Sequence, residues 1–277
     1  MKFISKLEAR WAHSNSLLCV GLDPQLDRIP EHFKKRNSPY LDFCTAIVDA
    51  THELVCCFKP QVAYFSAVGA EDQLERLVLY IKEQHPDIPV ILDAKRGDIG
   101  STAALYAKEA FERYGADAVT VNPYLGFESI EPYMKYEDKG IVVLCRTSNP
   151  GSDWLQKDKK DSVPVYQRVA KQVADWNKED QFVLVTGATY PEELGVVRKI
   201  VGRMPLLVPG IGAQGGDIES VIEVGLDQKA QGLIIYSSRE ILYAHEKSDN
   251  NRLSDSETLR EAGLVARQTR DMINELR

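Results

Sequence analysis

The sequence predicts a closed (β/α)8 barrel, an α/β fold that takes up residues 1–277 as one domain. Eight short runs rich in Val, Ile and Leu recur along the chain, and most are continuously apolar, as expected for strands covered on both faces of a parallel sheet. Segments with helical periodicity separate them. Eight strand and helix units over about 250 residues are typical of a barrel. A doubly wound open sheet is the alternative, but the strand count and even spacing favour the barrel.

The eight apolar runs are the predicted strands, at 17–22, 55–58, 90–92, 118–121, 141–144, 182–185, 206–208 and 232–235. Helical periodicity predicts helices at 41–56, 73–80, 101–114, 191–200 and in the C-terminal segment from Ser254. Gly115 is a stop signal after the third of these, and Pro191 suits the first turn of the fourth. Ser254 and Glu257 form a capping-box pattern at the start of the last helix.

Three polar stretches, at 24–39, 149–162 and 247–252, are predicted to be loops. The second begins with Asn149-Pro-Gly-Ser and continues with many Lys and Asp residues, a composition typical of a mobile loop. We therefore expect residues 149–162 to form a lid.

Composition excludes several classes of protein. No apolar run approaches the roughly 18–20 residues that cross a bilayer, and the N-terminus does not resemble a signal peptide, so we expect a soluble cytoplasmic protein with no membrane partner. The five cysteines lack CxxC spacing and the five histidines are scattered, which disfavours disulfides and metal sites. A net charge of −7 disfavours nucleic acid as a partner, although a small anion could bind in a local basic pocket.

Polar residues that follow the apolar runs are the candidate site residues, because barrel enzymes carry their chemistry at the C-terminal ends of the strands. In chain order these residues are Asp23, Lys59, Asp93, Lys95, Asp98, Asn122, Arg146, Thr147, Ser148, Pro209, Gly210, Gln214, Ser237, Ser238 and Arg239.

The segment Asp93-Ala-Lys-Arg-Gly-Asp98 is the most informative of these. Asp93 and Lys95 are two residues apart, so on an extended strand end their side chains point to the same face, at the barrel mouth. Asp98 lies near a predicted helix start, where it could serve its own site or act across a dimer contact. If a single Asp-x-Lys pattern were the only evidence, a surface ion-pair cluster would explain it. Arg96-Gly97-Asp98 also matches an adhesion tripeptide, which the lack of a secretion signal disfavours.

A glycine-rich segment from Pro209 to Asp217 matches the GxGxxG pattern. The dinucleotide fingerprint belongs to the first βαβ unit of its domain, whereas this segment follows the seventh strand of eight. Exposed backbone N–H groups before a helix serve a single phosphate equally well, and barrels commonly bind phosphate after strands seven and eight. Arg239 is then predicted to bind the phosphate oxygens, with backbone N–H groups of Ser237 and Ser238 contributing.

Together these residues resemble the orotidine 5'-monophosphate decarboxylase family, in its longer bacterial branch, through nearly the whole chain. The resemblance implies that the family's charged array corresponds to Lys59, Asp93, Lys95 and Asp98. It further implies that Asp23, Thr102, Ser148, Gln214 and Arg239 serve substrate binding. Pro209 and Ser238, in the predicted phosphate site, are also expected to contact the substrate. In that family an Asp and a Thr with the spacing of Asp98 and Thr102 come from the neighbouring subunit, which implies a homodimer with shared active sites.

The resemblance implies decarboxylation of orotidine 5'-monophosphate to uridine 5'-monophosphate, without metal or cofactor. Loss of carbon dioxide from C6 leaves a carbanion with no electron sink, so the site must stabilise charge and deliver a proton. Lys95, kept charged by Asp93 and Asp98, is expected to do both, while Lys59 orients Asp93. Three alternatives stay open: a metal-dependent sugar-phosphate decarboxylase of the same superfamily, a Schiff-base aldolase using Lys95 or Lys59, and a barrel that binds a phosphate ligand without catalysis.

Overall fold

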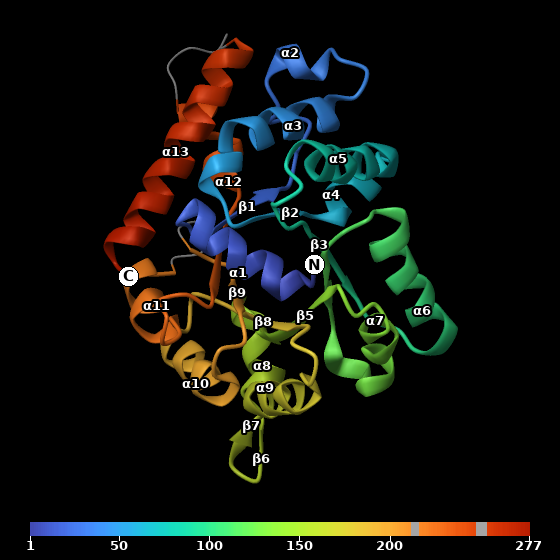
Figure 1. The fold of residues 1–277 in the computed structure, drawn as a ribbon, viewed down its shortest axis with the longest axis vertical. Helices are drawn as coiled ribbons and strands as arrows, with labels where there is room; N and C mark the ends of the chain where they lie inside the picture. Colours follow the sequence, from blue (N-terminus) through green and yellow to red (C-terminus); the bar gives the residue numbers. More distant parts are fainter. Residues whose placement is uncertain (212–215, 248–253) are drawn as a thin grey trace.

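A parallel eight-stranded barrel forms the centre of the computed structural model, which describes residues 1–211, 216–247 and 254–277 (Figure 1). The strands neighbour one another in the order β2-β1-β10-β9-β8-β5-β4-β3, and bridges from Phe58 to Val90 and from Gln61 to Asp93 close the ring. They are β1 (Leu18–Leu22), β2 (Cys57–Pro60), β3 (Ile91–Arg96), β4 (Ala118–Val121), β5 (Gly140–Arg146), β8 (Phe182–Thr186), β9 (Leu206–Val208) and β10 (Leu233–Ser237). Each overlaps one predicted apolar run, so the predicted barrel is confirmed.

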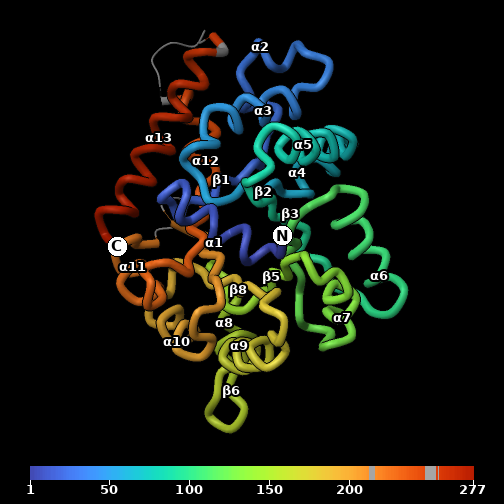
Figure 2. The backbone as a smooth tube through the Cα atoms, in the orientation of Figure 1, coloured from blue at the N-terminus to red at the C-terminus, as the bar shows by residue number. Residues whose placement is uncertain are grey.

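Helices form an outer layer around the barrel, as the tube in Figure 2 also shows. In chain order they are α2 (Glu31–Lys34), α3 (Pro39–Thr51), α4 (Val62–Ser66), α5 (Glu71–Gln84), α6 (Gly100–Lys108), α7 (Glu131–Met134), α8 (Asp153–Gln156), α9 (Val165–Trp176), α10 (Pro191–Val201), α11 (Ile218–Gly225), α12 (Arg239–Leu242) and α13 (Asp255–Glu275). Shorter turns are η1 (His52–Leu54), the π-helical η2 (Glu109–Arg113), η3 (Pro123–Leu125), η4 (Phe127–Ser129), η5 (Pro150–Ser152) and η6 (Ala244–Lys247). The capping box predicted at Ser254 is present. Within the described residues, no helix is both long and apolar enough to span a bilayer.

An N-terminal helix that the sequence did not predict, α1 (Phe3–Ser14), lies across the middle of the view in Figure 1. It buries Phe3, Leu7 and Trp11, which are spaced four residues apart and so share one face. Phe3 packs so closely on Gly140, the first residue of β5, that a side chain at Gly140 would overlap it. Helix α1 therefore covers the N-terminal end of the barrel, and the C-terminal end is left open.

The helix predicted at 41–56 extends too far at its C-terminal end. Helix α3 ends at Thr51, and β2 begins at Cys57 after the short turn η1. Arg10 of α1 explains the early end, because its guanidinium donates to the carbonyl oxygens of His52 and, at 2.9 Å, of Val55. Those carbonyls are thereby satisfied outside the helix.

Two of the three predicted loops contain short elements, so that prediction was wrong in part. The stretch 24–39 holds α2, which buries Phe33, a single apolar anchor in a polar segment. The stretch 149–162 holds η5, α8 and the strand β6 (Lys159–Lys160), which pairs with β7 (Val163–Pro164). Helix α8 is held by polar contacts, which the apolar periodicity of a sequence does not indicate. Most of the third stretch, residues 248–252, lies outside the described residues.

Candidate active site

The open end of the barrel holds a cavity of about 640 Å³, a size typical of small-molecule sites. Its lining includes the predicted site residues Asp23, Lys59, Asp93, Lys95, Ser148 and Pro209. They come from the C-terminal ends of β1, β2, β3, β5 and β9 or from the residues just after them. The structure therefore brings together candidates that are far apart in the sequence.

Asp93 is the centre of the charged part of the cavity. One carboxylate oxygen accepts a hydrogen bond from Lys59 Nζ at 2.5 Å, and the other accepts from Lys95 Nζ at 2.7 Å. Thr120 Oγ1 donates to the second oxygen at 2.8 Å. Lys59 and Asp93 are buried, whereas the side chain of Lys95 is 48% exposed and faces the cavity. We call Lys59, Asp93 and Lys95 the charged triad.

The end of β3 is not extended as predicted. The β3 to β4 register shifts between Leu92 and Arg96, and Lys95 has a φ of 47°, in the left-handed region. Thr120 of β4 stabilises this shape, because its hydroxyl oxygen accepts the backbone N–H groups of Ala94 and Lys95, both at 2.9 Å. Strained backbone of this kind is common at functional sites. Asp93 and Lys95 do meet, as expected, but through an irregular strand end.

Asp93 and Lys59 stay ionised over a wide pH range. Burial alone would raise the pKa of Asp93, but the charges of Lys59 and Lys95 lower that pKa well below its usual value. Burial alone would lower the pKa of Lys59, but Asp93, Tyr236 and Asp23 raise that pKa well above its usual value. Two ammonium groups thus share one carboxylate, and the triad suits an anionic ligand or developing negative charge.

Tyr236 of β10 connects the triad to Asp23, and the sequence analysis missed it. The Lys59 ammonium lies 3.9 Å from the centre of the Tyr236 ring, and the Tyr236 hydroxyl donates to Asp23 Oδ2. Burial raises the pKa of Tyr236 well above its usual value, which keeps that hydroxyl a donor. Gly21 of β1 makes room for the ring, since a side chain there would overlap it. Tyr236 directly follows the predicted run 232–235, but a tyrosine there also fits core packing, so it was not singled out as a site residue.

Asp23 has one oxygen available for a ligand. Its Oδ2 accepts from Tyr236 and, at 2.9 Å, from Ser238 Oγ. Its Oδ1 is buried and has no hydrogen-bond partner among the described residues. A buried acceptor left unpaired is costly unless a ligand satisfies it, so Asp23 is well suited to accept a hydroxyl of a ligand in the cavity.

A side pocket of about 200 Å³ adjoins the main cavity and shares Asp23, Tyr64, Pro209 and Tyr236 with it. Its remaining lining comes from residues that follow β9 and from the end of β10 through the start of α12: Gly210, Ile211, Ser237, Ser238, Arg239 and Glu240. Arg239 is the first residue of α12, and within the described part of the chain its guanidinium has no ion-pair partner. Gln214, also predicted to bind here, lies outside the described residues.

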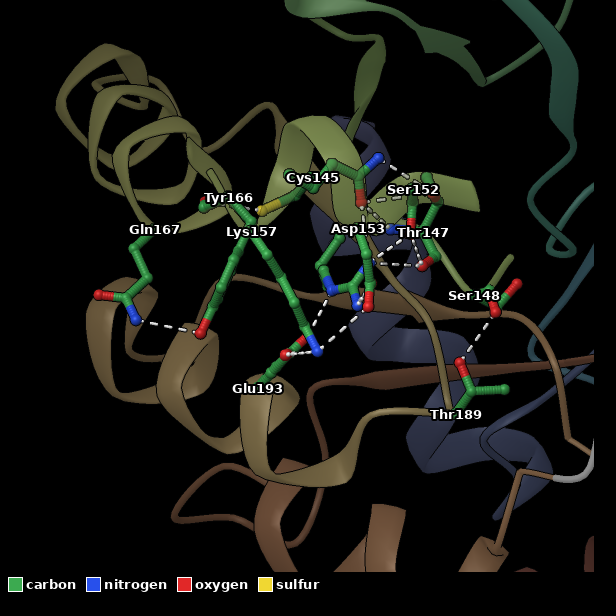
Figure 3. Close-up of polar contacts among 12 residues, drawn as sticks. Cys145, Thr147, Ser148, Ser152, Asp153, Lys157, Tyr166, Gln167, Thr189 and Glu193 are labelled. Atoms are coloured by element: carbon green, nitrogen blue, oxygen red, sulfur yellow. Dashed lines mark hydrogen bonds and ion pairs between the residues drawn. The ribbon is translucent and has the colours of Figure 1, made fainter. Parts of the chain in front are cut away.

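Ser148 lies in the cavity wall just after β5. Thr189 Oγ1 donates to its carbonyl oxygen at 3.0 Å, as Figure 3 shows. The backbone of Ser148 approaches Gly187 so closely that a side chain at 187 would overlap it. Glycine is therefore required at 187 for this placement.

Asp98 and Thr102 do not join the triad within one chain. Asp98 accepts a hydrogen bond from the N–H of Ile99 at 2.8 Å, and Thr102 is exposed on α6. Neither lines the main cavity or the side pocket. One chain therefore gathers three of the four charged residues that the resemblance assigned to catalysis. Among the described residues, no group of three or more His, Cys, Asp or Glu could hold a metal ion.

Comparison with known proteins adds an independent line of evidence. Residues 16–252 match the family described as "Orotidine 5'-phosphate decarboxylase / HUMPS family". The chain is 56% identical over 278 residues to the orotidine 5'-phosphate decarboxylase of Ralstonia pickettii, covering all of both chains, and 56% identical over 275 residues to that of Dechloromonas aromatica, covering 99% of each. It is similar to the solved structure of Leishmania donovani OMP decarboxylase, with a TM-score of 0.82 and 34% identity over 99% of this chain and 100% of that one.

Proposed function

Because this chain belongs to the orotidine 5'-phosphate decarboxylase / HUMPS family, we propose that it decarboxylates orotidine 5'-monophosphate to uridine 5'-monophosphate, the last step of pyrimidine nucleotide synthesis. The observation that carries this proposal is the charged triad at the mouth of the barrel. Four observations support it: the triad's net positive charge, its exposed Lys95, the lowered pKa of Asp93 beside the raised pKa of Lys59, and a cavity of suitable size.

In the proposed reaction the bond between C6 and the carboxylate carbon breaks, and its electron pair stays on C6 as carbon dioxide leaves. Lys95 then donates a proton from its ammonium group to C6 and regains one from water. The positive charge of Lys95 also stabilises the carbanion before the proton moves. Asp93 holds Lys95, and Lys59 balances the charge of Asp93. No metal or cofactor takes part in this scheme.

Substrate binding is proposed for the groups around the triad. The free Oδ1 of Asp23 accepts a hydrogen bond from a ribose hydroxyl, and Ser148 contacts the pyrimidine. The phosphate enters the side pocket, where Arg239 binds it together with Ser238 and Pro209. Because the phosphate is remote from C6, its binding energy helps to hold the reacting carbon against the triad.

We further propose that residues 1–277 act as one barrel domain in a homodimer, in which Asp98 and Thr102 complete the partner's site. The surface around these residues supports the interface, since Ile99, at the start of α6, and Leu105, within α6, are exposed apolar side chains. A cytoplasmic location is in keeping with five free, buried cysteines.

Mixing two inactive variants tests the shared site. Lys95→Met supplies an intact Asp98, and Asp98→Asn supplies an intact Lys95. If Asp98 acts across the dimer, random exchange of subunits gives one intact site in each mixed dimer, and about a quarter of wild-type activity returns. No recovery after verified subunit exchange would contradict the shared site.

The activity itself is tested by the loss of orotate absorbance when purified protein meets orotidine 5'-monophosphate, with and without EDTA. Turnover that EDTA does not affect is the expected result, and no turnover by the folded protein would overturn the proposal. The same sample separates the alternatives, since a metal-dependent sugar-phosphate decarboxylase would lose activity with EDTA and an aldolase would form an adduct trapped by borohydride. The names of the relatives already disfavour both alternatives.

A further inference from the structure

Arg146, the last residue of β5, is a buried cation that the proposed chemistry does not use. Its side chain has no exposed surface, although its guanidinium carries five N–H donors that all need partners. A buried charge is costly unless it is paired and hydrogen-bonded. The partners of Arg146 therefore indicate what the residue holds in place.

Those partners lie mainly in the segment that follows β5 (Figure 3). Arg146 Nη2 donates to Asp153 Oδ1 at 2.6 Å, and Nη1 donates to Ser152 Oγ and, at 3.3 Å, to Gln156 Oε1. The remaining nitrogen, Nε, donates to Glu193 of α10. One guanidinium thus ties η5 and α8 to the outer helix α10.

A second set of contacts reinforces this arrangement. Lys157 bridges the two carboxylates, at 3.1 Å from Glu193 and 3.4 Å from Asp153. The ring of Tyr190 lies 3.8 Å from the Arg146 guanidinium carbon. Burial would lower the pKa of Arg146, but Glu193 and Asp153 raise it, so the guanidinium stays charged at any accessible pH.

The segment held by Arg146 is one wall of the main cavity. Between Thr147 and Gln156 it contributes eight of the residues that line this cavity: Thr147, Ser148, Asn149, Gly151, Ser152, Trp154, Leu155 and Gln156. Gln156 closes the segment on itself, since it accepts the Thr147 N–H at 2.9 Å and donates to the Thr147 hydroxyl at 3.0 Å. The sequence predicted a mobile lid at 149–162, but a dense set of polar contacts holds its first half.

We infer that Arg146 is a positioning residue that fixes residues 147–157 as a preformed wall of the nucleotide site. This inference rests on the proposed function for its choice of ligand. A wall that is already ordered lowers the entropy lost on binding, and it presents Ser148 to the pyrimidine without rearrangement. Arg146 therefore acts through the segment it holds and touches no reacting atom.

Substitutions of Arg146 and Asp153 test this inference by separating binding from folding. Asp153→Asn removes one charged partner and leaves Glu193 in place, so the chain is expected to fold. Arg146→Met removes the whole set of contacts. For both variants we expect KM for orotidine 5'-monophosphate to rise about 3- to 30-fold, in line with the cost of ordering several side chains on binding, with kcat changed less than about threefold. Arg146→Lys keeps the charge without the planar guanidinium, so its KM should lie between those of the wild type and Arg146→Met. Asp180→Asn, which removes an exposed ion pair with Arg203 elsewhere, is the matched control.

Hydrogen exchange of the ligand-free protein gives a second readout that does not depend on activity. Amides of residues 147–157 should exchange at least about tenfold faster in Asp153→Asn than in the wild type, while the amides of β4 and β5 stay protected. Unchanged exchange together with unchanged KM would overturn the inference. Loss of kcat in proportion to the folded fraction, at constant KM, would show that Arg146 only stabilises the fold. If the wild type does not turn over orotidine 5'-monophosphate, the proposed function fails, but the exchange result still decides the role of Arg146.

Discussion

Lysine and arginine cations lie at both ends of this barrel, but their burial and their partners differ. At the N-terminal end, Arg198 donates to four backbone carbonyls, those of Gly202, Met204, Gly225 and Gly232, at 2.6–2.7 Å. At the open end, Lys59 and Lys95 share the carboxylate of Asp93. Arg198 uses nearly all its donors on the chain itself, whereas Lys95 Nζ has one hydrogen bond within the described residues and faces a cavity.

The difference shows that a buried charge is not by itself a sign of function. Burial lowers the pKa of Arg198 to about 10, so this residue is also electrostatically perturbed, yet it caps the ends of α10 and α11 and the start of β10. A cation satisfied by carbonyls stabilises the fold. A cation that shares its counter-ion and keeps free donors beside a cavity is available to a ligand.

The largest expected effect is that of Asp93→Asn at the open end. Without the carboxylate, Lys59 is a buried charge with no counter-ion, and Lys95 loses its anchor. We expect kcat to fall by at least about a thousandfold, since both proton transfer and charge stabilisation depend on this geometry. Steady-state kinetics on protein whose folding is verified by circular dichroism measures the loss. A decrease below tenfold would remove Asp93 from the account.

At the other end, Arg198→Met should give the opposite pattern. Four carbonyls lose their donor, and we expect the unfolding free energy to drop by about 3 kcal/mol or more, while kcat per folded molecule changes little. Urea unfolding and kinetics at low temperature measure the two quantities. A large loss of kcat in fully folded protein would mean that Arg198, at the N-terminal end of the barrel, affects the active site at the open end. Arg198 would then not be a purely structural cation.

Arg239→Met tests the side pocket. Removing a charge-assisted contact to phosphate should raise KM about 10- to 100-fold. As a check, inorganic phosphite can be added together with a substrate that lacks the phosphate group. Phosphite should increase the turnover of this substrate more in the wild type than in the variant. Equal KM values for both proteins would show that the phosphate binds elsewhere.

Tyr236→Phe should have a smaller effect, because Asp23 keeps its bond from Ser238. One lost hydrogen bond corresponds to about a tenfold rise in KM or less. Isothermal titration with uridine 5'-monophosphate measures the change in binding directly. A loss of kcat at constant KM would mean that the Tyr236 hydroxyl serves the chemical step rather than substrate binding through Asp23.

The pH dependence of stability distinguishes the triad from ordinary surface charges. Since the folded-state pKa of Asp93 is lowered, its contribution is present above the usual carboxyl pKa of about 4 and is lost as pH falls below it. The difference in unfolding free energy between wild type and Asp93→Asn should therefore shrink below about pH 4. Urea titrations at pH 3 and pH 6 measure it, and an unchanged difference would contradict the lowered pKa.

Much of the fold could be predicted because its cause is local and repetitive. Each strand overlaps an apolar run, and such runs can be recognised without knowledge of the rest of the chain. The end of β3 shows the limit: the sequence placed Asp93 and Lys95 together, but the bend that joins them depends on Thr120, 27 residues after Asp93. Helix α1 was missed because its apolar face is narrow.

The site was predicted where residue type alone indicates chemistry, and missed where contacts give a common residue its role. Asp23, Lys59, Asp93 and Lys95 follow apolar runs as isolated charges, which is a visible pattern. Tyr236 looks like one more apolar strand residue. Arg146 was visible as a strand-end cation, but its burial and its contacts depend on the fold. One of its partners, Glu193, lies on α10, 47 residues further along the chain. The lid was therefore predicted from composition alone, and its first half is anchored.

The most direct test of the central claim is the single-turnover rate of orotidine 5'-monophosphate decarboxylation by Lys95→Met. Because the Lys95 side chain is half exposed, this variant should fold and bind uridine 5'-monophosphate like a wild-type barrel. We expect its rate to fall by at least about a thousandfold. A rate within tenfold of the wild type would contradict the claim that the triad delivers the proton to C6.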